Sequence, residues 1–176
     1  MGYAGARMLE ALLESLLALE FLEKGYTRNA AGKAFQAWKA LVGVISALEK
    51  DKLAETLKTE EQKKWLTEIG ILRVPTTKLK RLAQLIEDAG YTSFTHYTST
   101  ALDLHNYQYY GPDPDRALSE YTTPEEAVKD TLLLLRTLVE LVEDKLKPKL
   151  GQANAWTEKH EQALQQLKKR LGMGKE

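Results

Sequence analysis

The segment from Arg28 to Glu49 constrains the fold more than any other part of the chain, because about half of its helical circumference is apolar. At 100° per residue its apolar side chains form one wide arc, made of Ala30, Ala34, Ala37, Trp38, Leu41, Val44, Ile45 and Leu48. An arc of this width must face a core. The sequence therefore predicts a long helix here that is mostly buried.

A narrow polar stripe runs along the other half of the same helix. Asn29, Lys33 and Gln36 form this stripe. It continues along Ala40 and Gly43, which are small enough for another backbone or a ligand to approach closely. A polar stripe on a mostly buried helix indicates either a lined cavity or a polar seam between helices, and the sequence leaves both open.

The composition excludes several classes of protein. The chain has 176 residues, of which 43% are hydrophobic; this is enough for one core, and we expect a single domain over residues 1–176. Its 25 basic and 25 acidic residues give a net charge of zero, so no segment resembles a nucleic-acid-binding arm, although a local basic pocket is compatible with this balance. The absence of cysteine excludes disulfides, thiolate catalysis and cysteine-based metal sites.

A membrane role is not expected. No apolar run has the length of a membrane span. The leucine-rich start is interrupted by Glu10, Glu14 and Glu20, unlike the apolar part of a secretory signal. We therefore expect a cytoplasmic protein that makes no contact with membranes.

Helix start and stop signals recur along the whole chain. Thr27 is the expected N-cap of the mostly buried helix, and Gly70 is expected to close a short helix further on. Thr123 opens a capping box and is followed by Pro124, which suits the first position of a helix. Pro148 is expected to end the helix that Pro124 begins.

These signals predict an all-α fold. The predicted long helices cover residues 6–24, 28–49, 93–109 and 124–147, and a C-terminal amphipathic helix covers residues 153–171. We expect the four long helices to form an up-and-down bundle with a core over residues 6–147, with short helices beside it. The helix 153–171 is an accessory element, and His160 on its apolar stripe is expected to pack against the bundle.

His105 is the candidate catalytic residue. In its predicted helix it shares the inward face with Thr98, whereas His96 lies on the opposite face. Near neutral pH an inward imidazole can act as a general base or acid, particularly beside Lys33. The alternative is a structural histidine that is hydrogen-bonded within the core.

A cationic cluster occupies the start of the mostly buried helix. Exposed N–H groups and the helix dipole favour an anion there, and two basic side chains reinforce this preference. We expect a phosphate or a carboxylate to bind, in a cavity shared with His105. The alternative is that the basic side chains are solvated or pair with glutamates of a neighbouring helix. The expected anion- or nucleotide-binding residues are Arg28, Asn29, Lys33, Gln36, Asn106 and Tyr109.

No metal and no cofactor are expected. The chain contains no HExxH motif, P-loop, glycine-rich nucleotide turn, nucleophile elbow or EF-hand loop. No glutamate stands three residues before His96 or His105, as diiron bundles require.

Three stretches of the chain resemble the archaeal PaREP family. They are Gly25 to Leu48, which contains the run RNAAGKAFQAWKA, Leu104 to Gly111, and Tyr121 to Ala127. The resemblance covers about residues 9–147 and implies a relationship to the HEPN superfamily of helical bundles. Those bundles dimerise and act in RNA cleavage, in toxin–antitoxin pairs or as partners of nucleotidyltransferases. By this resemblance we expect a homodimer. Its expected ligand is a nucleotide or an RNA, and its expected protein partner is a nucleotidyltransferase or an antitoxin.

The resemblance supports the fold and dimerisation more than a nuclease reaction. In active HEPN ribonucleases an Arg, commonly followed by Asn, precedes a His by four to six residues. Arg28 and Asn29 match this opening, but Lys33 stands where His is expected. His105 has no Arg in the six positions before it.

Three functions are compatible with these observations. The first is a HEPN-like module that binds a nucleotide or RNA phosphate through the cationic cluster, in a toxin–antitoxin type system. The second is a homo-oligomeric structural or partner-binding bundle, in which Lys33, Gln36 and His105 form a polar seam. The third is a metal-independent ribonuclease with His105 as the base. The first two are favoured over the third, so the sequence favours a binding protein and leaves a metal-independent endoribonuclease activity open.

Overall fold

The computed structural model describes residues 2–174, and every regular element in this range is a helix. The longest helices are α1 (Gly2–Glu23), α2 (Thr27–Leu48), α7 (Phe94–Tyr110) and α8 (Pro124–Leu141). The shorter elements are α3 (Lys50–Glu55), α4 (Glu60–Trp65), η1 (Leu66–Gly70), α5 (Ile71–Arg73), η2 (Thr76–Lys78), α6 (Leu79–Asp88), η3 (Val142–Leu146), α9 (Lys147–Gln152) and α10 (Glu158–Arg170). The prediction of an all-α fold is confirmed. None of the helices within residues 2–174 is long and apolar enough to cross a membrane.

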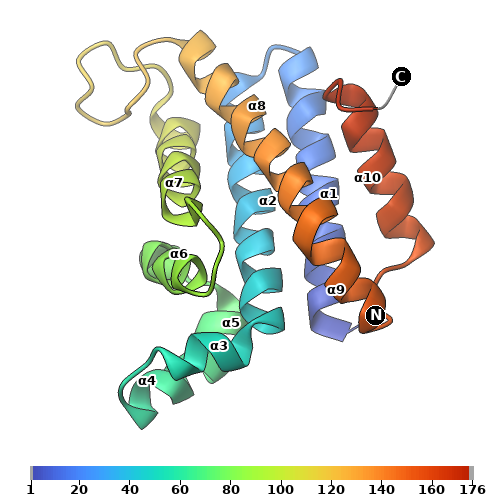
Figure 1. The fold of residues 1–176 in the computed structure, drawn as a ribbon. Helices are drawn as coiled ribbons and strands as arrows, with labels where there is room; N and C mark the ends of the chain where they lie inside the picture. Colours follow the sequence, from blue (N-terminus) through green and yellow to red (C-terminus); the bar gives the residue numbers. More distant parts are fainter. Residues whose placement is uncertain (1, 175–176) are drawn as a thin grey trace.

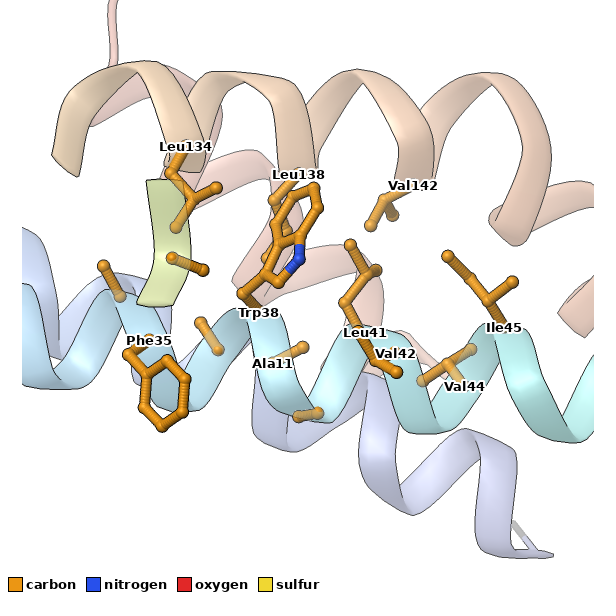
Figure 2. Packing of buried hydrophobic residues seen from close by; sticks show 14 of the residues in the cluster. Ala11, Phe35, Trp38, Leu41, Val42, Val44, Ile45, Leu134, Leu138 and Val142 are labelled. Carbon is orange, nitrogen blue, oxygen red and sulfur yellow. The ribbon is translucent and has the colours of Figure 1, made fainter. Parts of the chain in front are cut away.

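Helix α2 is enclosed by other helices along most of its length. It packs most extensively against α1, and it also contacts α7 and α8; Figure 1 shows α8 crossing over it. Figure 2 shows Trp38, Leu41 and Ile45 extending from α2 toward Leu138 of α8 and Val142 of η3. All five side chains are buried. The prediction that the apolar arc of this helix faces a core is therefore confirmed.

The start of α8 follows its sequence signal. The Thr123 hydroxyl accepts a hydrogen bond from the Glu126 N–H, and the Glu126 carboxylate accepts one from the Thr123 N–H. Pro124 occupies the first turn, where a missing N–H costs no intrahelical hydrogen bond. This capping box is purely local, and for that reason the sequence located the helix start correctly.

The prediction that Thr27 caps α2 is wrong. Thr27 is the first residue of the helix, and Tyr26 before it makes no side-chain cap hydrogen bond. The Thr27 hydroxyl instead lies 2.8 Å from the Tyr107 hydroxyl of α7. A hydrogen bond between two helices thus takes the place of a local cap.

Two predicted helix ends are also wrong, because helical structure continues past Gly70 and Pro148. The segments η1 and η3 are π-helical turns, and an α-helix resumes after each of them. Pro148 lies in the first turn of α9, a position that tolerates proline. A π-turn accommodates a local interruption of the regular hydrogen-bond pattern without ending the helix.

The last helix, α10, begins at Glu158 rather than near residue 153, and it lies beside α1 (Figure 1). His160 is fully buried, so its predicted packing role is confirmed. Its Nδ1 lies 3.1 Å from the Thr157 N–H nitrogen, and its Nε2 lies 2.8 Å from the Gly5 carbonyl oxygen. Because Nδ1 accepts the Thr157 N–H, the proton is on Nε2, and a neutral imidazole joins α10 to α1.

A buried carboxylate joins three segments at the end of α2. Glu49 is 4% exposed; it accepts hydrogen bonds from Tyr91, which follows α6, at 2.8 Å and from Lys149 of α9. Burial by itself raises the pKa of Glu49, but the hydrogen bonds from Lys149 and Tyr91 outweigh it, and the pKa is lowered. The ionised carboxylate therefore holds the turn between α6 and α7, together with α9, against α2.

We expect Glu49→Gln to remove an acid-sensitive part of the stability. A carboxylate whose pKa is lowered by folding stabilises the protein above its unfolded pKa, near 4.5, and this contribution is lost as the pH falls through the folded pKa. The variant should be less stable than the parent protein by about 1–3 kcal/mol at pH 7. Urea unfolding at pH 7 and at acid pH measures the difference, which should shrink at the lower pH. A difference that is the same at both pH values would contradict this account.

Candidate functional site

A polar face formed by α1, α2 and α7 contains most of the predicted site residues. It holds two clefts. The first, of about 390 Å³, is lined by Glu14, Phe21, Asn29, Gly32, Lys33, Gln36 and Gln108. The second, of about 420 Å³, is lined by Arg28, Asn29, Gln108 and Tyr109. Because Asn29 and Gln108 line both, the two clefts adjoin, and we call them together the amide cleft.

The amide cleft depends on a close approach between α2 and α7. A Cβ atom at Gly32 would lie 2.5 Å from Cδ of Gln108, closer than a real contact allows. The missing side chain at Gly32 therefore lets Gln108 lie directly on the α2 backbone. The sequence predicted such an approach at Ala40 and Gly43, and it missed Gly32.

Arg28 spans the gap between the start of α2 and the end of α7. Its Nε donates to the Gln108 carbonyl at 3.1 Å, and a terminal nitrogen donates to the Tyr109 carbonyl. These carbonyls belong to the last turn of α7, where backbone oxygens have no partner within the helix. Arg28 is therefore a capping residue for α7, and two of its five N–H groups are used in this role.

Lys33 forms an ion pair with Glu14 of α1, with 2.9 Å between Nζ and Oε2. The sequence had left open whether Lys33 binds an anion or pairs with a glutamate of a neighbouring helix. Its side chain is 35% exposed, so the ion pair borders the amide cleft rather than lying inside the core. The positive charge of this part of the cleft is consequently offset by a carboxylate.

His105 belongs to an aromatic column between the core and the surface. Its ring stacks on Phe35 with centroids 4.1 Å apart, and the Tyr109 ring meets it edge-on at 5.2 Å. Its Nδ1 atom is buried and has no hydrogen-bond partner among residues 2–174. His105 does not line the cleft that contains Lys33. Asn106 is exposed at the next position of α7, about 100° around the helix from His105.

Sequence reasoning missed a second basic cluster on the polar face, formed by Arg7 and Lys39. A Cβ atom at Gly43 would lie 3.1 Å from the Tyr3 hydroxyl and 3.2 Å from Nε of Arg7, so both α1 side chains reach this end of the polar stripe. Nε of Arg7 is buried without a hydrogen-bond partner in the described part of the chain. Nζ of Lys39 lies 3.4 Å from the Thr76 hydroxyl.

The pKa values of the basic groups reflect their crowding. Burial lowers the pKa of Lys39, and the positive charge of Arg7 lowers it further. Burial also lowers the pKa of His105, and the charge of Lys39 adds to this effect. His105 is therefore a neutral imidazole at pH 7, and its buried Nδ1 is without a hydrogen-bond partner in residues 2–174.

One of the two missed residues carried a signal in the sequence. Lys39 follows Gln36 by three residues and precedes Gly43 by four, so it lies on the predicted polar stripe. Arg7 carried no such signal, because its approach to α2 depends on how α1 is rotated about its own axis. Within the described residues, no group of three or more His, Asp or Glu side chains could hold a metal ion.

Comparison with known families identifies the chain. The model of the archaeal PaREP1/PaREP8 family matches residues 6–132. The chain belongs to this family, which confirms the resemblance described above. No curated protein and no solved structure matches the chain. The matched range contains α2, α7 and all of α1 except its first four residues, whereas α9 and α10 lie beyond it.

We expect Arg28→Ala to loosen the end of α7. The substitution removes the guanidinium donors from the carbonyls of Gln108 and Tyr109, at a cost of about 1 kcal/mol because water can reach this exposed turn. Hydrogen–deuterium exchange should become faster in the last turn of α7. Arg116→Ala is the matched control, since Arg116 pairs with Glu120 in an exposed loop, and it should leave α7 unchanged. Equal exchange in the two variants would contradict the capping role.

Proposed function

We propose that the chain is a nucleotide- or RNA-binding module without catalytic activity of its own, and that the amide cleft is its ligand site. The supporting observation is the aromatic column, which runs from buried Phe35 through half-buried His105 to Tyr109 at the cleft. Tyr109 is 59% exposed. A large ring held by the core but presented to solvent in a cleft is a suitable platform for an unpaired base.

The amide cleft offers the groups that recognise an unpaired nucleotide. Tyr109 provides an aromatic surface for stacking, which every base can use. Asn29, Gln36 and Gln108 carry side-chain amides, and each amide can both donate to and accept from the edge of a base. Arg28 has N–H groups beyond the two that cap α7, and a guanidinium pairs well with a phosphate. Recognition in this cleft would depend on stacking and amide hydrogen bonds more than on charge.

We further propose that α1, α2, α7 and α8 form a HEPN-like bundle that acts as a homodimer or as an accessory partner in a toxin–antitoxin type system. Family membership and the packing of α2 against α1, α7 and α8 support this proposal. Leu13 and Leu17 on α1 are 47% and 38% exposed, and dimerisation would bury such apolar surface.

Substitution of Tyr109 tests base recognition. We expect Tyr109→Ala to weaken binding of a short single-stranded oligoribonucleotide by roughly tenfold or more, because one stacked base contributes about 1–3 kcal/mol. Tyr109→Phe should retain most of the affinity. Tyr110→Ala is the control, since Tyr110 is similarly exposed at 53% but does not line the second cleft. Fluorescence anisotropy gives the affinities. Unchanged binding in Tyr109→Ala, or no binding by the parent protein, would reject the proposal.

A metal-independent ribonuclease is the second candidate, because His105 is neutral at pH 7 and its Nδ1 has no hydrogen-bond partner within residues 2–174. Such an imidazole can act as a general base toward a ribose hydroxyl. If this candidate is correct, the protein cleaves RNA in the presence of EDTA and leaves cyclic phosphate ends, and His105→Ala abolishes the cleavage. Intact RNA after incubation with the parent protein would rule this activity out.

A further inference from the structure

We propose that Arg7, Lys39 and His105 form a binding site for a phosphate or a similar oxyanion, on the polar face beside the amide cleft, whose Tyr109 ring contacts His105. This inference goes beyond the proposed function, because an anion alone would occupy the site and no base contact is needed. None of the three residues lines the amide cleft.

The site follows one side of α2. His105 contacts this helix at the buried Phe35, Lys39 lies one turn further along, and Arg7 reaches the helix at Gly43. With a rise of about 1.5 Å per residue, the two outer contact points lie about 12 Å apart, and Lys39 stands midway between them. Lys39 therefore lies one helical turn from the contact point of His105 and one turn from that of Arg7.

Two buried nitrogens of the site lack partners. Arg7 uses a terminal nitrogen to pair with Glu10, but its Nε has no hydrogen-bond partner within residues 2–174. Nδ1 of His105 is in the same situation. Buried polar atoms are normally hydrogen-bonded, so the orphaned N–H of Arg7 indicates a ligand that carries acceptors. His105 donates to the same ligand when the proton of its imidazole is on Nδ1.

The charges of the site favour an anion as that ligand. The positive charges of Arg7 and Lys39 destabilise one another in a partly buried setting, as the lowered pKa of Lys39 reflects. Glu10 pairs with Arg7, and this one carboxylate leaves the cluster with an excess of positive charge. A bound oxyanion would supply the missing negative charge as well as acceptors for the N–H groups.

The loop between α5 and η2 completes the surroundings of the site. Val74 is buried in the left-handed conformation, with φ of 44°, which is unfavourable for a β-branched residue. This conformation turns the chain so that Thr76 places its hydroxyl near Nζ of Lys39. A hydroxyl and an ammonium group at one point form a common type of phosphate contact.

Inorganic phosphate is the probe for this site. We expect phosphate to raise the melting temperature of the parent protein and to raise the pKa of His105 in an NMR titration, because a nearby anion favours the imidazolium form. In calorimetry, Lys39→Met should weaken phosphate binding at least tenfold. Lys24→Met removes the same charge from an exposed helical ion pair and should change the affinity less than twofold.

A second substitution guards against misfolding as an explanation. Arg7→Lys keeps the charge but loses the Nε donor, and it should weaken phosphate binding while the circular dichroism spectrum stays unchanged. The inference is overturned if phosphate leaves the His105 signal unmoved, or if Lys39→Met and Lys24→Met bind phosphate equally.

Two further measurements separate this inference from the proposed function. Asn29→Ala alters the amide cleft and leaves the ring contact between Tyr109 and His105 in place, so it should weaken oligoribonucleotide binding and bind phosphate as the parent protein does. If an oligoribonucleotide displaces the bound inorganic phosphate, the anion that the site recognises is a phosphodiester backbone. If only a nucleoside monophosphate displaces it, the anion is a terminal phosphate. Loss of phosphate binding in Asn29→Ala would contradict a separate site.

Discussion

The burial of α2 is the constraint on which the rest of the structure depends. Its apolar and small residues are covered by α1, α7 and α8, and burial of apolar surface is the main favourable contribution to folding. Most of the polar side chains of α2 lie along one narrow stripe. These side chains cannot enter the core without partners, so the helices that flank the stripe must also present polar groups. The polar face is therefore a direct consequence of how α2 is packed.

The contact between α2 and α7 decides the geometry of that face. It consists of specific polar and aromatic contacts as well as apolar packing: Nε1 of Trp38 donates to the Thr98 hydroxyl at 2.9 Å, and Phe35 stacks on His105. Gly32 allows the two helices to approach closely at Gln108. Each of these contacts fixes the rotation of α7 about its axis. As a result, Tyr109 borders the amide cleft, whereas His105 lies one turn away toward Lys39.

Local signals in the sequence were reliable where no distant residue competed with them. The capping box of Thr123 and Glu126 is satisfied within one turn, and the α8 start was located from it. Thr27 has the same kind of side chain, but its hydroxyl is paired with Tyr107 of another helix. Pro148 appeared to be a stop, yet a π-turn before it lets helical structure continue. In each failure, a tertiary contact or a backbone rearrangement overrode the local preference.

By itself, the sequence determined the all-α fold, the buried arc of α2 and the polar stripe opposite to it, because helical periodicity is a property of neighbouring residues. It also identified the family, through short runs that a family model matches. Only the tertiary structure decided which partners meet the stripe. It paired Lys33 with Glu14, assigned Arg28 to the end of α7, and brought Arg7 beside Lys39. Those contacts depend on the rotation and offset of helices that are distant in the chain, and periodicity carries no information about either.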